Sequence, residues 1–153
     1  MSVMRQRGFT LIELMVALAV AIVLMGVAVP SFFESTARAR LQGAVNELAI
    51  DLQYARSQAV RERAAVALTV AADGASYTIT DPTATLKTVT LPRGVMLTAN
   101  TTVSYDALRS LSAAALFDAT VSGVSGSLRV NTNALGRVQL CSPSGAFGGY
   151  PTC

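Results

Sequence analysis

The two cysteines, Cys141 and Cys153, are the side chains of this sequence best suited to covalent chemistry. Their spacing fits neither a Cys-x-x-Cys redox motif nor a four-ligand zinc site. Serine, proline, glycine and threonine lie between them, which is typical of a loop closed by a disulfide. A disulfide needs an oxidising compartment, so such a bridge would place this part of the chain outside the cytoplasm. Two free buried thiols are the alternative that the spacing leaves open.

A carboxylate, Glu13, lies inside the most apolar part of the sequence. Between Phe9 and Phe33, 20 of 25 residues are apolar, and the 20 residues from Leu14 to Phe33 carry no charge. A carboxylate in lipid is costly unless it is paired or lies close to the headgroups. Glu13 therefore needs a partner, which makes it a candidate for an interaction site.

The rest of the composition argues against acid–base and metal chemistry. The chain has no histidine, which excludes Ser-His-Asp triads, Cys-His pairs and metal sites with histidine ligands. Its 12 basic and 9 acidic residues give a net charge of +3, too small to indicate a dense nucleic-acid-binding patch. We therefore expect no enzyme, no metal and no cofactor, and at most a mild attraction to anionic surfaces.

The 153 residues suffice for one ordinary domain and one membrane-length segment. As a helix, the run from Leu14 to Phe33 spans about 30 Å, the hydrocarbon thickness of a bilayer. A secretory signal peptide has a shorter apolar region, of about 7–15 residues, and ends at a small-x-small site. The length of the run and the carboxylate near its start favour a membrane helix. Arginines flank both ends, so the positive-inside rule leaves the orientation open.

The residues around Glu13 resemble the leader junction of type IV prepilins and type II secretion pseudopilins. A short cationic leader is followed by a glycine, a phenylalanine and an apolar run that contains a glutamate: Arg7-Gly8-Phe9-Thr10-Leu11-Ile12-Glu13-Leu14. The resemblance implies that a prepilin peptidase cuts between Gly8 and Phe9 and that the new N-terminus at Phe9 is methylated. It also implies that Glu13 pairs with the N-terminal amine of a neighbouring subunit. Pro30 lies where pilin helices commonly kink, as expected for a residue that removes a helical hydrogen bond.

The remaining sequence predicts a helix followed by an antiparallel sheet, an α+β fold. Six apolar residues at steps of three and four predict one helix from about Phe9 to about Arg63, whose second half packs on the sheet: Leu41, Val45, Leu48, Leu52, Ala55 and Ala59. Alternating segments predict strands at 66–71, 77–80, 86–91, 95–99, 115–120, 127–131 and 137–142, the first two joined as a hairpin at Asp73-Gly74. The segment from Tyr105 to Leu111 fits either a short helix or a strand.

This order of elements, closed by the two cysteines, resembles the GspH/FimT family of minor pilins and pseudopilins. The matching stretches are a Leu-x-x-Ala-Arg-Ser-x-Ala run between Asn46 and Arg61, and Leu135-Gly136-Arg137 before a strand that ends at Cys141. The resemblance implies a cleaved leader (1–8), a transmembrane and assembly half of the helix (9–36) and a pilin-like head (37–153). It implies a single span in the inner membrane, a periplasmic head and later entry into a pilus or pseudopilus. The implied partners are other pilin subunits, the prepilin peptidase and membrane lipid.

Some FimT-type members of the family contribute to DNA uptake, and a Gly-Arg-x-Arg motif near the C-terminus is associated with that role. The corresponding residues here are Gly136, Arg137, Val138 and Gln139, so glutamine replaces the second arginine. One cationic phosphate contact is kept and one is lost, which lowers both the affinity and its salt dependence. Arg137 and Gln139 are the candidate DNA contacts, and a solvated strand residue is the alternative interpretation of Arg137.

Two arginines and two aromatic residues are candidates for extending that contact. Arg93 and Arg129 would add charge if they lie near Arg137, and Phe147 and Tyr150 are able to stack on bases. The alternative for the two aromatic residues is that they pin the disulfide loop onto the core.

Three functions are compatible with the sequence. The first is a minor pilin, a structural subunit of a type IV pilus that acts in assembly or priming near the tip, with a contribution to DNA uptake. The second is a minor pseudopilin of a type II secretion system, and the third is a pilus-associated DNA receptor for natural transformation. The expected disulfide favours the pilus branch.

Overall fold

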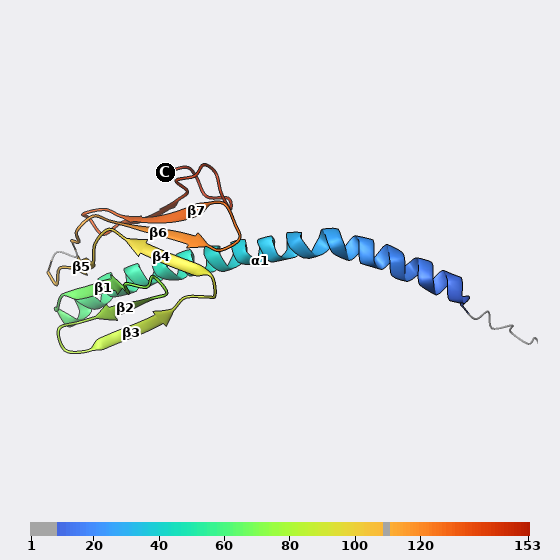
Figure 1. Ribbon diagram of the computed structural model, residues 1–153. Helices are drawn as coiled ribbons and strands as arrows, with labels where there is room; N and C mark the ends of the chain where they lie inside the picture. The colour runs from blue at the N-terminus through green and yellow to red at the C-terminus, as the bar shows by residue number, and fades with distance from the viewer. Residues whose placement is uncertain (1–8, 109–110) are drawn as a thin grey trace, which may run out of the picture. The chain divides into compact units, whose positions relative to one another are not determined.

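The computed structural model describes residues 9–108 and 111–153, apart from the side chains of residues 27–30. The leader, including Gly8, lies outside the described residues. In the described part, one long helix, α1 (Leu11–Glu62, 52 residues), is followed by eight strands (Figure 1). The chain divides into two compact units, Met1–Ser35 and Thr36–Cys153.

The first part of α1 exposes its apolar side chains. Leu11, Ile12 and Leu14 are 79%, 65% and 64% exposed. By length and composition α1 is able to cross a membrane. Its most apolar stretch of 18 residues has a mean hydropathy of 2.7, and none of that stretch is buried. An apolar helix of the expected length is therefore present.

The second part of α1 is amphipathic and forms one side of the core. All six residues of the apolar stripe noted in the sequence, from Leu41 to Ala59, are 0% exposed. The helix ends at Glu62, and Arg63 follows with a φ of 50°, a left-handed conformation typical of the residue after a helix. The predicted helix, expected from about Phe9 to about Arg63, is confirmed to within two residues at each end.

The strands form two antiparallel sheets of four. One sheet has the order β3-β2-β1-β5 and the other β4-β6-β7-β8. The eight strands are β1 (Val66–Val70), β2 (Ser76–Thr80), β3 (Thr85–Thr90), β4 (Val95–Ala99), β5 (Val103–Tyr105), β6 (Ala115–Val121), β7 (Ser127–Thr132) and β8 (Val138–Cys141). The predicted α+β order of a long helix followed by antiparallel strands is confirmed, and seven of the eight strands lie where alternation predicted them.

The division into two sheets was not predicted. Alternation shows which face of a strand is buried but not which strands pair, because several pairings bury the same faces. Here β4 pairs with β6 rather than with β3. The two sheets meet where the Leu97 amide donates to the Gly74 carbonyl at 2.9 Å. Gly74 has a φ of 68°, and a Cβ there would come within 2.6 Å of the Leu97 carbonyl oxygen, so the hairpin turn requires glycine.

The described part of the segment from Tyr105 to Leu111 forms neither of the two expected elements. Strand β5 ends at Tyr105, where that segment begins, and pairs with β1. Asp106 then makes a turn, because its carboxylate accepts the Leu108 amide at 2.6 Å. Residues 109 and 110 lie outside the described residues. The strand is thus followed by a turn in which a side chain binds a backbone amide two residues further along the chain. The hydrophobic periodicity of the sequence does not reveal such a contact.

A buried carboxylate joins α1 to the β1–β2–β3 side of the core. Asp51 is 4% exposed and accepts hydrogen bonds from the Tyr77 hydroxyl at 2.7 Å and from the Lys87 ammonium at 2.7 Å to each oxygen. Glu47 lies 3.5 Å from the same ammonium. Burial is the larger cause that raises the pKa of Tyr77, and the hydrogen bond to Asp51 raises it further. The hydrogen bond to Asp51 is also the main cause that raises the pKa of Lys87. Both groups are therefore held in their protonated forms.

Candidate functional site

Helix α1 begins with a threonine cap directly before the candidate assembly glutamate. The Thr10 hydroxyl accepts the Glu13 amide at 3.3 Å, and the Thr10 carbonyl accepts the Leu14 amide at 3.2 Å. Thr10 is thus the N-cap and Glu13 the third helical residue, the Thr-x-x-Glu order of a capping box. Sequence reasoning missed this cap, although the spacing was visible. The partial positive charge of a helix N-terminus favours a carboxylate at this place.

Glu13 is exposed and surrounded by exposed apolar side chains. Among the residues that the structure describes, no side chain or amine hydrogen-bonds or ion-pairs with its carboxylate. Phe9, the residue expected to carry the new N-terminus, is 84% exposed. The backbone at Pro30 belongs to α1, but its side chain lies outside the described residues, so the kink stays a prediction.

Arg137 is positioned by a tight turn between β7 and β8. The Asn133 carboxamide oxygen accepts the amides of Leu135 at 3.1 Å and Arg137 at 2.9 Å. Gly136 has a φ of 70°, and its amide donates to the Asn133 carbonyl at 2.8 Å. The turn therefore places Arg137, which is exposed, at the entry to β8.

A groove lies between this turn and the end of α1. It has a volume of about 800 Å³ and is lined by Gln53, Arg56, Ser57 and Val60 of α1 and by residues 135–138. Within the described chain, the guanidinium groups of Arg56 and Arg137 form no hydrogen bond or ion pair. The structure thus brings a second cation, Arg56, to Arg137, and sequence reasoning did not connect the two.

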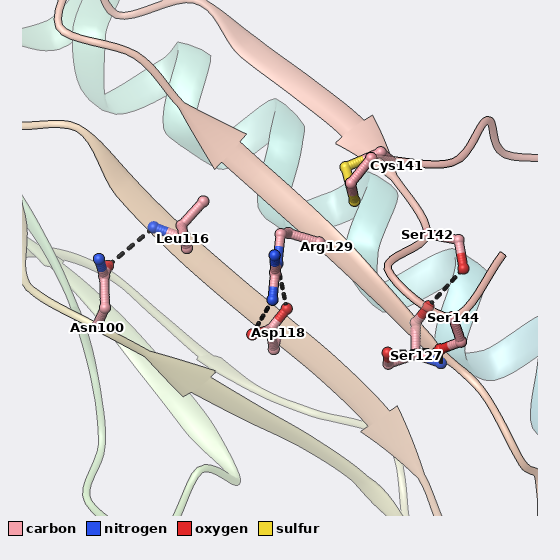
Figure 2. Close-up of polar contacts among 9 residues, drawn as sticks. Asn100, Leu116, Asp118, Ser127, Arg129, Cys141, Ser142 and Ser144 are labelled. Atoms are coloured by element: carbon pink, nitrogen blue, oxygen red, sulfur yellow. Dashed lines mark hydrogen bonds and ion pairs between the residues drawn. A yellow bond between two sulfur atoms is a disulfide. The ribbon is translucent and has the colours of Figure 1, made fainter.

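The other candidate DNA contacts are not brought to this groove. Gln139 lines a separate hollow of about 420 Å³ with Arg129 and the two cysteines. Arg129 forms two hydrogen bonds to its cross-strand neighbour Asp118, at 2.6 and 2.9 Å (Figure 2). The charge of Arg129 is therefore balanced by Asp118. Arg93 lies in the turn before β4, outside the groove.

The two aromatic candidates contact α1, Phe147 as a buried side chain and Tyr150 as a half-buried one. Phe147 is 9% exposed, and the Arg38 guanidinium lies 5.3 Å from its ring centre. The Tyr150 hydroxyl lies 3.0 Å from the Asn46 amide oxygen, and the Gln42 amide donates to the Gly148 carbonyl at 2.7 Å. These contacts match the alternative interpretation, in which the aromatic residues pin the loop.

A disulfide joins Cys141 to Cys153 and closes that loop (Figure 2). The loop also bonds to β7, because the Ser142 hydroxyl donates to the Ser127 carbonyl at 3.0 Å. No group of three or more His, Cys, Asp or Glu side chains suited to a metal ion occurs within the described residues.

Two protein-family models match the chain, one at its N-terminus and one over most of the head. Residues 3–29 match the prokaryotic N-terminal methylation motif. Residues 44–147, about two thirds of the chain, match the model described as type II transport protein GspH. The chain belongs to the GspH family. A search of curated protein sequences found no significant match to this chain.

Solved structures show the same fold. The type IV minor pilin FimU of Pseudomonas aeruginosa is 24% identical, with a TM-score of 0.60 over 72% of this chain and 97% of that one. The minor pseudopilin EpsH from the type 2 secretion system of Vibrio cholerae is 14% identical, with a TM-score of 0.59 over 68% of this chain and 98% of that one. At these identities the similarity establishes the fold alone.

The GspH-family assignment and the methylation motif define the class of protein. The chain is a minor pilin or pseudopilin of the type IV pilus and type II secretion class, whose members are structural subunits. Its N-terminal motif and apolar helix imply processing by a prepilin peptidase, membrane anchoring and assembly with other pilin-type subunits.

Proposed function

We propose that this GspH-family chain is a minor pilin: a structural subunit of a type IV pilus that acts in assembly or priming at or near the tip. Before assembly it is held in the inner membrane by a single span, with the head (37–153) in the periplasm. The observation that carries the proposal is the carboxylate of Glu13, which has no partner among the described residues and lies at the capped start of an exposed apolar helix.

Assembly gives that carboxylate its missing partner. After cleavage between Gly8 and Phe9, the methylated amine of a neighbouring subunit's Phe9 carries the opposite charge. A paired carboxylate is far less costly in an apolar environment than an isolated one. The exposed apolar side chains of α1 exchange lipid for helix–helix packing in the same step. The energetics therefore favour association of subunits through the beginning of α1.

The pilus branch is supported by the covalently closed loop of the head. The disulfide and the contacts of the loop to Arg38, Gln42 and Asn46 fix the C-terminal segment on α1. A bridge of this kind persists in an oxidising exterior, where the head of a surface filament works.

A deletion strain separates the two branches when it is scored in parallel for surface pili, protein secretion and DNA uptake. The proposal expects fewer surface pili and unchanged secretion, with both restored to the wild-type level by the gene on a plasmid. Normal piliation together with a loss of secretion would assign the chain to the pseudopilus instead.

DNA contact is a second candidate function, favoured by one observation. Arg137 is exposed, unpaired within the described chain and accompanied by Arg56 in one groove. Two cations and no stacking residue in the groove support a weak contact to backbone phosphates, independent of sequence and strongly dependent on salt. The role of a transformation receptor, or of an aid to DNA uptake, depends on that contact.

A gel-shift titration of the mature, detergent-solubilised chain with duplex DNA tests this candidate. Arg137→Ala should lower the affinity and flatten its salt dependence by about one phosphate contact. Gln139→Arg should restore the family pattern and raise the affinity, and Arg93→Ala is the control that removes a charge elsewhere. If Arg137→Ala loses nothing and Gln139→Arg gains nothing, the motif is only a turn and the start of a strand.

A further inference from the structure

The C-terminal loop covers one side of α1 over part of its length. Further along the helix, the described chain leaves the same side open as a groove. Arg38, Gln42 and Asn46 follow one another at steps of four and contact the loop. Continuing at steps of three and four, the same side reaches Gln53, Arg56 and Val60, which line the groove. The groove is therefore the continuation of a surface that already binds a chain segment.

The covered part shows what this side of α1 accepts. Arg38 lies over an aromatic ring, and Gln42 donates to a backbone carbonyl. The segment bound there thus offers an apolar side chain and a hydrogen-bond acceptor to cationic and amide donors. Gln53 and Arg56 repeat the amide donor and the cation in the groove, and Val60 adds an exposed apolar side chain to them.

The charge of the groove is stronger than that of the covered part and is not balanced. Arg56 and Arg137 line it together, and neither forms an ion pair within the described residues. Two like charges beside partly buried walls produce a positive potential that favours a carboxylate. In the neighbouring hollow, by contrast, Arg129 is neutralised by Asp118.

The apolar walls favour a protein segment over DNA. Val60 is 51% exposed and Leu135 is 67% exposed, and Val138 adds a third apolar wall. Contacts to DNA phosphates would use only the two arginines and would leave these aliphatic side chains facing solvent. Exposed aliphatic side chains beside two arginines complement a segment that has both an apolar residue and an acidic one.

We propose that the groove lined by Arg56, Arg137, Val60 and Leu135 docks an acidic, apolar segment of another subunit of the same filament. The segment places an apolar side chain on Val60 and Leu135 and a carboxylate between the two guanidinium groups. This inference rests on the proposed function, because it requires the chain to enter a filament.

Photo-crosslinking of filaments assembled by living cells tests the inference with the full chain. The photoreactive residue p-benzoylphenylalanine replaces Ser57 in the groove, or Thr98, an exposed residue on β4, as the control. Sheared filaments are irradiated, and the adducts are mapped by mass spectrometry. We expect a Ser57 adduct with a segment of another prepilin-type subunit that contains Asp or Glu next to apolar residues, and no such adduct from Thr98.

Charge reversal then tests the electrostatic part. Arg56→Glu with Arg137→Glu should lower the adduct yield by about tenfold, whereas Arg93→Glu should leave it unchanged. Replacing the mapped carboxylate of the partner by Lys should restore the yield. Each variant is checked for the disulfide and for unchanged protease resistance. If the double reversal fails to fold, Arg56→Gln with Arg137→Gln is scored in its place.

Several results would overturn the inference. A nuclease-sensitive adduct would assign the groove to DNA, and an adduct unaffected by charge reversal would remove the role of the arginines. A chain that enters filaments without forming a Ser57 adduct would refute the docking groove and leave the proposed function intact. A chain that never enters filaments, with its groove unchanged, would refute both proposals.

Discussion

At the scale of single residues, the polar side chains of the head fall into two groups: those that bind another side chain of the head, and those that bind none within the described residues. Asp51, Tyr77 and Lys87 share hydrogen bonds at 2.7 Å and tie α1 to β2 and β3. Arg129 is bound by Asp118 in the same way. Arg56 and Arg137 have no such partner in the described chain. The paired residues therefore contribute to stability, and the unpaired ones are available for binding.

The first prediction concerns the hydroxyl that holds Asp51. Tyr77→Phe should lower the free energy of unfolding of the head by about 1.5–3 kcal/mol, because a buried hydrogen bond to a charged group is lost. Urea unfolding of the head (37–153) measures this. Tyr54→Phe is the matched control, since Tyr54 lies on the exposed face of α1. Equal stability of the two variants would show that the Asp51 hydrogen bond contributes nothing.

The second prediction is that the head loses stability in alkali. Burial raises the pKa of Tyr105 to about 12, against the opposing charge of Arg56, and the pKa values of Tyr77 and Lys87 are also raised from 10.0 and 10.5. The folded state thus holds protons that the unfolded state releases, so stability is fully present below pH about 10 and falls above it. Urea unfolding at a series of pH values measures the slope. A slope that Tyr77→Phe leaves unchanged would contradict this origin.

At the scale of elements, the disulfide loop and α1 stabilise one another. The loop has a sequence separation of 12 between its cysteines and is held by contacts that come from one side of α1. Fixing the loop therefore also decides where the covered side of α1 ends and the groove begins.

The third prediction is that Cys153→Ser loosens this element. Loss of the bridge should lower the free energy of unfolding by about 3 kcal/mol in the chain-entropy model. It should also make the bond between Gly148 and Gly149, which is already exposed, more susceptible to limited proteolysis because the backbone there becomes less ordered. Tyr150→Phe, which removes only the contact to Asn46, should have a smaller effect. Two alkylatable thiols in protein from the native envelope would show that the bridge does not form there.

The fourth prediction separates the two roles of the helix start. Glu13→Leu should be processed and folded but enter sheared filaments poorly, because the partner of the neighbour's amine is lost. Thr10→Ala removes the cap, at a cost of about 1 kcal/mol to the helix, but keeps the carboxylate, so it should assemble. The amount of each variant in sheared filaments is the measurement. Normal incorporation of Glu13→Leu would show that the pairing has no role here.

At the scale of the whole molecule, the chain combines an apolar helix for storage in the membrane with a folded head whose polar contacts are largely satisfied internally. In the proposed function, membrane anchoring depends on the composition of α1, whereas entry into a filament depends on a processed N-terminus. The two steps are therefore controlled by different parts of the chain.

The fifth prediction concerns that processing. Gly8→Val should leave a full-length protein with its leader in the membrane, because the peptidase needs the smallest side chain beside the scissile bond. N-terminal sequencing of the wild-type chain should begin at a methylated Phe9. A mature start anywhere beyond Ala28 would instead indicate an ordinary signal peptide.

The sequence by itself determined the features that depend on local order. The apolar run, the amphipathic stripe from Leu41 to Ala59 and most strands follow from composition and period, because a helix or strand exposes its periodicity within a few turns or pleats. The family followed from the resemblance of short motifs, above all the leader junction from Arg7 to Leu14. The spacing of Cys141 and Cys153 favoured a disulfide over two free thiols, and the structure contains that bridge.

The tertiary structure alone decided which distant residues meet. It divided the strands into two sheets, paired Arg129 with Asp118, packed Phe147 against Arg38 and brought Arg56 to Arg137. Local periodicity carries no information on these contacts, because they depend on strand order and on the side of α1 that each loop reaches. The candidate DNA residues were therefore separated, and the groove emerged only from the fold.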